Sequence, residues 1–238
     1  MSVAIMQPYF FPYLGYFQLV QAVDHFVFYD DVMFIKKGWI NRNRILMQGN
    51  EFLFTIPLEK QSQNKTIRES TVSWGKEFPN KFMNQLDSTY KKAPNYAEVR
   101  GLVEQVLNRK FESLADLASE SVQATWAYLG LEKKFYQSSQ LSVSEDLGRA
   151  ERLIEITKSL GESSYINAVN GQELYEKGFF KENGIDLILS HTRGGAIWYA
   201  TDAIDVTKSV TEGLNKKYNA NPAAAEAKAA AADSTAKK

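Results

Sequence analysis

The chain has 238 residues, of which 44% are hydrophobic and 24% are charged, a composition typical of a globular protein with a sizeable core. Its formal net charge is zero, so no overall field attracts nucleic acid or an anionic membrane. The absence of cysteine excludes disulfides, thiolate nucleophiles and zinc–thiolate sites, and no stretch approaches the roughly 20 apolar residues of a membrane-spanning helix.

The N-terminal segment also lacks the basic and apolar regions of a secretory signal, so we expect a cytoplasmic protein with no insertion into a membrane. Only two histidines exist, His25 and His191, and no Asp, Glu and His residues are grouped at metal-ligand spacing. We therefore expect no cofactor, with a magnesium ion as an open alternative.

The first thirty residues predict a strand–helix–strand unit. The apolar run 2–6 is typical of a buried strand, and two prolines and a glycine then shape an aromatic loop. Apolar residues at helical spacing predict a helix over 15–23, and 26–29 predicts a second strand. Such a unit implies parallel strands and a right-handed crossover.

The rest of the chain predicts a strand pair, three helices and further alternation of helix and strand. The predicted strands are 40–46, 52–58, 135–137, 165–166 and 185–189, and the predicted helices are 81–92, 98–109, 114–129, 149–160 and 173–182. We therefore expect an α/β domain over 1–193, with a parallel-sheet core and a helical insertion at about 79–130. Residues 194–238 differ in character and are of low complexity from about residue 219.

Polar and aromatic residues follow the predicted strands at the edge of the sheet where ligands bind in open parallel sheets. Gln7, Tyr9 and Tyr16 belong to the loop and helix start after the first strand, and Asn167 follows the strand 165–166. The helix start could also hold an anion through its free N–H groups. The alternative is that the aromatic rings only cover the core and that Asn167 makes ordinary turn contacts.

Asp30 and Asp31 come directly after the second strand. Paired carboxylates in this place could orient a hydroxyl or an amine, act as a base, or hold a magnesium ion. The alternative for either aspartate is a turn or a helix cap.

A basic segment with one tryptophan follows: Lys36-Lys37-Gly38-Trp39-Ile40-Asn41-Arg42-Asn43-Arg44. In a strand, alternation places Asn41 and Asn43 on one face and Arg42 and Arg44 on the other. Arginine forks suit phosphates and carboxylates. A solvated basic edge strand is the plain alternative, and RNA binding is a weaker one because the segment is short and the chain is neutral.

Three of these segments together resemble the WbqC-like family: Gln7-Pro-Tyr-Phe-Phe-Pro-Tyr-Leu-Gly-Tyr-Phe-Gln-Leu, Tyr29-Asp-Asp-Val and Ile35-Lys-Lys-Gly-Trp-Ile-Asn-Arg-Asn-Arg-Ile. Later segments extend the resemblance to about residues 3–190. It implies a place among bacterial surface-polysaccharide genes and the transfer of an acyl or aminoacyl group, glycine in particular, to an amino sugar of O-antigen. The partner it implies is a small molecule, a nucleotide-linked sugar.

The same resemblance suggests a pocket formed by the first loop, the two aspartates and the segment from Lys37 to Asn43, with Asp30, Asp31 and Lys37 as the candidate catalytic residues. In that scheme Asp31 deprotonates the attacking amine, Arg42 and Arg44 hold a phosphate, and Trp39, Asn41 and Asn43 contact the substrate. A non-catalytic binding or assembly factor of a polysaccharide gene cluster is the alternative function.

Two further similarities concern arrangement. The strand, proline loop and helix are similar to those of the nucleotidyltransferase-like fold, within a Rossmann-like core, although Tyr16 stands where that group has a histidine. The segment from Gly195 to Val210 resembles the end of Skp/OmpH-type periplasmic chaperones, which makes a chaperone-like role a third possibility.

Overall fold

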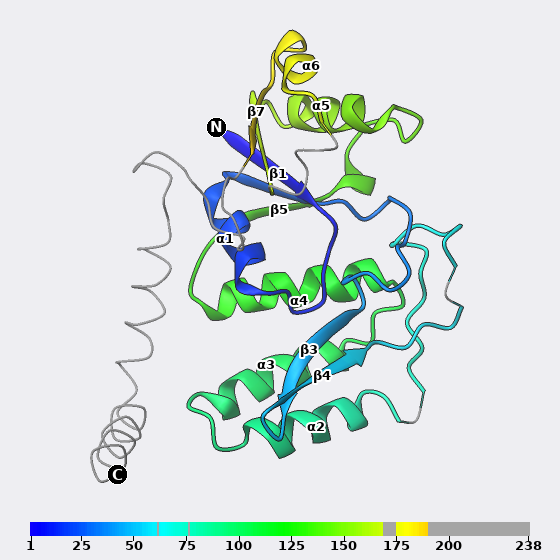
Figure 1. Cartoon of the computed structure of the whole chain (residues 1–238), viewed down its shortest axis with the longest axis vertical. Coiled ribbons are helices and arrows are strands. Elements are labelled where there is room, and N and C mark those ends of the chain that lie inside the picture. Colours follow the sequence, from blue (N-terminus) through cyan, green and yellow to red (C-terminus); the bar gives the residue numbers. More distant parts are fainter. Residues whose placement is uncertain (61, 76, 169–174, 190–238) are drawn as a thin grey trace, which may run out of the picture.

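The structure, a computed structural model, describes residues 1–60, 62–75, 77–168 and 175–189 (Figure 1). Five parallel strands form one sheet in the order β5-β2-β1-β6-β7, and two antiparallel strands, β3 and β4, form a separate hairpin. The strands are β1 (Ser2–Met6), β2 (His25–Phe28), β3 (Arg42–Met47), β4 (Asn50–Thr55), β5 (Lys134–Gln137), β6 (Ser164–Asn167) and β7 (Asp186–Leu189). The predicted α/β fold with a parallel sheet is confirmed.

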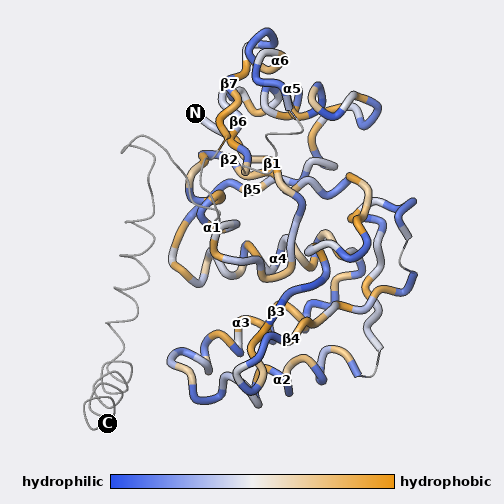
Figure 2. The backbone as a smooth tube through the Cα atoms, viewed as in Figure 1, coloured by the Kyte–Doolittle hydropathy of each residue, from blue (hydrophilic) through white to orange (hydrophobic). Residues whose placement is uncertain are grey.

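The central strand β1 is hydrophobic because helices cover both faces of the sheet. Its residues Val3 and Ala4 are fully buried, and Val3 pairs with His25 of β2 on one side and with Tyr165 of β6 on the other. A short strand that is apolar along its length is what burial on two faces requires. Along β7 the backbone tube is likewise predominantly hydrophobic (Figure 2).

Within the described residues, three α-helices connect the parallel strands and three belong to the insertion between β2 and β5. The connecting helices are α1 (Leu14–Ala22), α5 (Arg149–Ser159) and α6 (Lys177–Glu182), and the inserted ones are α2 (Asn80–Tyr90), α3 (Tyr96–Asn108) and α4 (Leu114–Tyr128). Their bounds agree with the predicted helices within one or two residues at most ends. The last helix begins at Lys177, later than predicted: its predicted start, residue 173, lies outside the described residues, but residues 175 and 176 are described and are not helical.

The strands of the hairpin β3–β4 lie closer to their turn than the predicted strands 40–46 and 52–58, because the turn has only two residues. Gln48 and Gly49 both have positive φ, 51° and 80°, the conformation that tight hairpin turns use. Gly49 therefore fits the turn without steric cost, and the two strands begin and end nearer to it than the sequence indicates.

Helix α4 contributes to two hydrophobic clusters. Its first half, including Leu114 and Leu117, packs with the hairpin and the other inserted helices. Its second half, including Val122 and Trp126, packs with α1 and the sheet. In a third cluster, residues of α5 and α6 pack against the sheet. In Figure 1, α4 lies between the sheet and the layer of hairpin, α2 and α3.

The described helices include none that is both long and apolar enough to cross a membrane. The predicted division at residue 193 stays a prediction, because residues 190–238 lie outside the described part of the chain.

Candidate functional site

The carboxyl ends of the parallel strands bring several predicted residues to one edge of the sheet. Gln7 follows β1, Asp30 and Asp31 follow β2, and Asn167 ends β6. The chain leaves β1 toward β2 and returns from β5 to β6, so its direction reverses between β1 and β6. Such a reversal opens the crevice in which doubly wound sheets bind ligands.

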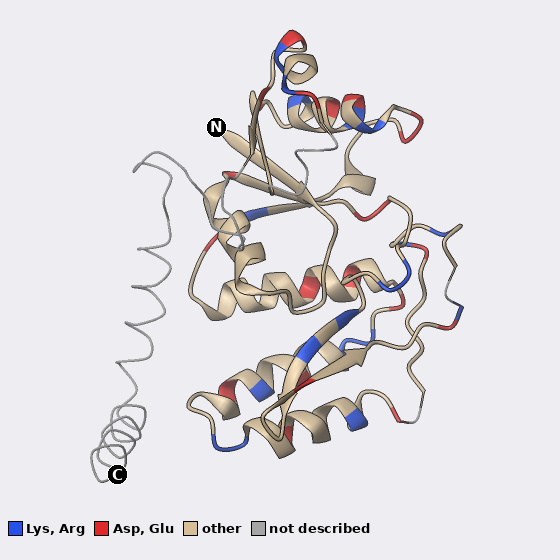
Figure 3. Ribbon diagram, in the orientation of Figure 1, with Lys and Arg blue, Asp and Glu red and all other residues tan. Residues whose placement is uncertain are grey.

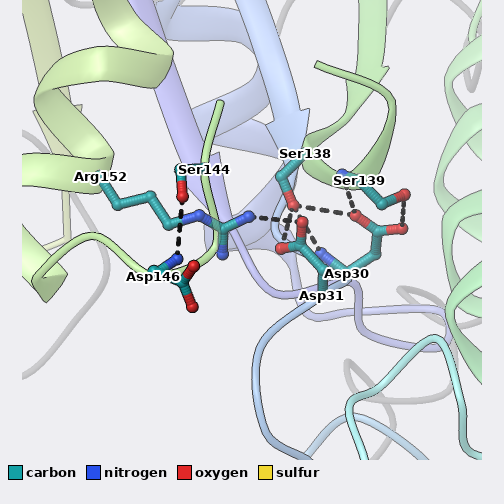
Figure 4. A network of polar contacts seen from close by, with 7 residues as sticks. All are labelled: Asp30, Asp31, Ser138, Ser139, Ser144, Asp146 and Arg152. Atoms are coloured by element: carbon teal, nitrogen blue, oxygen red, sulfur yellow. Dashed lines mark hydrogen bonds and ion pairs between the residues drawn. The ribbon is translucent and has the colours of Figure 1, made fainter. Parts of the chain in front are cut away.

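Asp30 is buried and joins the end of β2 to the end of β5. Its Oδ1 accepts hydrogen bonds from the Ser138 hydroxyl at 2.9 Å and from the Ser139 backbone N–H at 3.0 Å, and its Oδ2 accepts one from the Ser139 hydroxyl at 2.6 Å (Figure 4). Only 1% of Asp30 is exposed. The two contacts from Ser139 hold this carboxylate at the end of β5, and we interpret Asp30 as a structural acceptor.

Asp31 forms a buried ion pair with a residue of α5. Its Oδ2 lies 2.5 Å from Nη2 of Arg152, and its Oδ1 lies 2.6 Å from the Ser138 hydroxyl, which has one proton to share between Asp31 and Asp30 (Figure 4). Burial lowers the pKa of Arg152, but the hydrogen bond and the charge of Asp31 outweigh it, and the pKa is raised overall. The guanidinium therefore stays charged, and a substrate that uses Asp31 as a base must replace the Ser138 hydroxyl.

Two phenols and a second arginine surround this ion pair. The Arg152 guanidinium lies over the Tyr29 ring, 5.1 Å from its centroid. Burial raises the pKa of Tyr29 and Tyr175, while the nearby charges of Arg152 and Arg149 respectively oppose the rise. The Nε of Arg152 is buried and has no hydrogen-bond partner among the described residues. This side of the sheet edge is thus suited to an anionic or polar ligand group.

Tyr16 contacts the aromatic loop from the first turn of α1. Its hydroxyl donates a hydrogen bond to the Gln7 carbonyl at 3.0 Å, and its ring lies 5.7 Å from that of Tyr9. Only 2% of Tyr16 is exposed, and burial raises its pKa well above the usual value. In this conformation Tyr16 positions the loop, whereas Tyr9 is half-buried.

Asn41 and Asn43 contact backbone carbonyls. The Asn41 amide donates to the Ile56 carbonyl at 2.9 Å, and the Asn43 amide donates to the Phe11 carbonyl at 2.5 Å. Asn41 is only 1% exposed. The two amides therefore attach the basic segment to the residue that follows β4 and to the aromatic loop, contacts that strand alternation did not indicate.

Arg42 and Arg44 enclose Trp39 on the surface. Their guanidinium carbons lie 5.8 and 5.0 Å from the centroid of its ring, which is 43% exposed. Arg44 also pairs with Glu51 at 3.3 Å. Figure 3 shows Lys and Arg in blue along β3, while charges of both signs are interspersed over the other described elements.

Among the described residues, Lys37 makes no hydrogen bond or ion pair with either aspartate. It is exposed and has a left-handed backbone conformation with φ of 62°. Within the described part of the chain, Trp39 and the two arginines beside it likewise make no hydrogen bond or ion pair with Asp30 or Asp31. No group of three or more His, Asp and Glu side chains suited to a metal ion is found there either.

Sequence reasoning missed the partners of the two aspartates. Ser138 and Ser139 follow the predicted strand 135–137 directly, so the rule that selected Asp30 would also have selected them. Arg152 shows no such signal, since it lies within a helix and faces the site only through the packing of α5 on the sheet.

The model of the WbqC-like protein family matches residues 7–199, most of the chain. The chain belongs to the WbqC-like protein family. It is also 27% identical over 187 residues to Uncharacterized protein Rv1507c of Mycobacterium tuberculosis (strain ATCC 25618 / H37Rv), an alignment that covers 77% of this chain and 79% of that protein.

No solved structure matches the chain. The family match confirms the resemblance and runs slightly beyond residue 190, where we expected it to end. Nothing in the comparisons supports the similarity of residues 195–210 to Skp/OmpH-type chaperones, and that segment lies outside the described residues.

Proposed function

We propose that this WbqC-like protein transfers an acyl or aminoacyl group, such as glycine, to the amine of a nucleotide-linked sugar used for a bacterial surface polysaccharide. The observation that carries the proposal is the Asp31–Arg152 ion pair at the carboxyl edge of the sheet, next to the reversal between β1 and β6. A carboxylate there can accept a proton, and the guanidinium beside it can attract an anionic group of the substrate.

In the proposed reaction the sugar amine attacks the acyl carbonyl. A C–N bond forms, the bond from the carbonyl carbon to its leaving group breaks, and the leaving group takes the electron pair. The amine proton passes to Asp31 once the amine has replaced the Ser138 hydroxyl at Oδ1. Gln7 and Asn167 would contact the sugar, and Arg42 and Arg44 would hold a phosphate if the ligand extends along the aromatic loop.

The first test is a thermal-shift panel with UDP-, dTDP- and GDP-linked amino sugars, ATP and aminoacyl donors. A ligand at about 100 times its dissociation constant adds about 2.7 kcal/mol of stability. We expect one nucleotide sugar to raise the melting temperature and Arg42→Ala to abolish the shift. A cooperative melt that no ligand moves would contradict the nucleotide-sugar proposal and favour a binding or assembly role.

The second test separates a transferase from a non-catalytic module. Asp31→Asn should lose turnover when assayed below its own melting temperature. Ligand should still raise that melting temperature. Ser138→Ala is the matched control, since it removes a hydrogen bond from the same carboxylate but leaves the charge in place. Equal turnover in Asp31→Asn and Ser138→Ala would show that Asp31 is not the base.

A further inference from the structure

A hollow lies between the hairpin β3–β4 and the start of α2. It has a volume of about 510 Å³, within the range of small-molecule sites. Four phenylalanines form its wall: Phe52, Phe54, Phe78 and Phe82. The rings of Phe54 and Phe82 lie 4.5 Å apart and both residues are buried, so this part of the wall is fixed by packing. Figure 1 shows that α4 separates this region from the sheet.

The hollow also carries two opposite charges. Glu77 and Lys81 both line it, and both are exposed residues. Neither forms an ion pair with any residue in the described ranges. Lys81 belongs to the first turn of α2, where the helix dipole adds to the attraction for an anion. An aromatic wall flanked by a carboxylate and an ammonium group that have no ion-pair partner within the described residues is complementary to a small apolar zwitterion.

We propose that this hollow binds a free apolar α-amino acid with a large, preferably aromatic, side chain. The side chain packs against the phenylalanine wall, the α-carboxylate pairs with Lys81, and the α-ammonium group pairs with Glu77. The site is distinct from the sheet edge, and the inference goes beyond the proposed transfer reaction because it requires no turnover. Burial of aromatic surface supplies most of the attraction, and the two charges select the zwitterion.

Titration of the full chain with three related probes, followed by NMR or calorimetry, tests the inference. L-tryptophan carries both charges, indole-3-propionate lacks the ammonium group, and tryptamine lacks the carboxylate. We expect L-tryptophan to bind best. Lys81→Gln should weaken L-tryptophan and indole-3-propionate by roughly fivefold and leave tryptamine unchanged, because an exposed ion pair contributes at most about that factor. Glu77→Gln should weaken L-tryptophan and tryptamine and leave indole-3-propionate unchanged.

Phe52→Ala should weaken all three probes together, because it removes part of the shared apolar wall. The matched control is Leu46→Ala on the same hairpin, a residue that is 51% exposed and does not line the hollow. Melting curves verify that each variant folds. Lys81→Gln and Glu77→Gln change exposed residues only. Absence of binding by every probe overturns the proposal, and so does equal binding of the three probes. Neither result bears on the sheet-edge site, whose test uses different ligands.

Discussion

At the scale of single residues, the two carboxylates predicted from the sequence are buried and paired with other side chains. Asp30 accepts bonds from two serines and Asp31 pairs with Arg152, with 1%, 7% and 4% of these three charged residues exposed. Their position after a strand could be predicted from the apolar run before them. Their partners could not, because Arg152 approaches from a helix more than a hundred residues further along the chain.

Arg152→Met should lower the free energy of unfolding by about 3–5 kcal/mol, because it leaves the buried charge of Asp31 without its partner. Urea unfolding at neutral pH measures the loss. Arg44→Met is the control, since Arg44 and Glu51 are largely exposed and their ion pair should contribute less than about 1 kcal/mol. Equal midpoints for the two variants would contradict the assignment of Asp31 and Arg152 as a stabilising pair.

The asparagines of the basic segment show where pattern reasoning ends. Alternation correctly separates Asn41 and Asn43 from Arg42 and Arg44, as the contacts of the four side chains show. Alternation says nothing about which groups an amide meets across the chain. The Phe11 and Ile56 carbonyls that bind these amides come from a loop and a strand end that only the tertiary structure brings near.

At the scale of elements, helices and strands follow from hydrophobic periodicity, and most predicted bounds are close to those observed. The exceptions are the hairpin, whose strands lie closer to their two-residue turn at Gln48 and Gly49, and α6, which begins only at Lys177. Contacts between elements are harder to predict. Helices α2 and α3 are joined by Asp87, which accepts hydrogen bonds from the Tyr96 hydroxyl and from Arg100 Nε at 2.9 Å.

The Asp87 contacts predict a pH dependence of stability. The hydrogen bond from Tyr96, and then that from Arg100, lower the pKa of Asp87. A lowered folded-state pKa stabilises the protein above the unfolded value of about 3.9, and this contribution is lost as the pH falls through the folded value. Asp87→Asn should therefore flatten the loss of stability below about pH 4.

Thermal unfolding of wild type and Asp87→Asn at a series of acidic pH values measures this difference. Tyr96→Phe serves as the second variant, because it removes one of the two hydrogen bonds and keeps the titrating carboxyl group. It should fall between wild type and Asp87→Asn. Parallel curves for wild type and Asp87→Asn would contradict the prediction.

At the scale of the whole molecule, the sequence predicts a parallel sheet with an insertion but not the order of its strands. Alternation of strand and helix implies parallel neighbours, and the first unit predicts that β1 pairs with β2. That β6 takes the other side of β1 depends on which crossover buries the most surface, which no local pattern reveals. The sharing of α4 between two hydrophobic clusters is likewise a property of the assembled chain.

Because α4 belongs to both clusters, we expect the sheet and the insertion to unfold together. Leu117 packs in the cluster of the insertion and Leu19 in the cluster of the sheet, with 0% and 2% of each exposed. Leu117→Ala and Leu19→Ala should each lower stability by about 2–5 kcal/mol. Both should shift one common transition, seen alike by tryptophan fluorescence and far-UV circular dichroism.

Leu14→Ala is the control for this pair, since that leucine is 54% exposed and should change stability by less than about 0.5 kcal/mol. Two separate transitions, with each core variant moving only one of them, would show that the insertion is an independent domain.

The central position of β1 has a consequence for the order in which the protein is made. Its neighbour β2 leaves the ribosome soon after it, but β6 follows only after the whole of residues 7–163. Until then β1 has an unpaired, apolar edge in the middle of the future sheet, a type of edge that readily pairs with other chains. Nascent chains interrupted before β6 should thus be the form most prone to aggregate. This topology therefore requires that the edge of β1 be protected during synthesis.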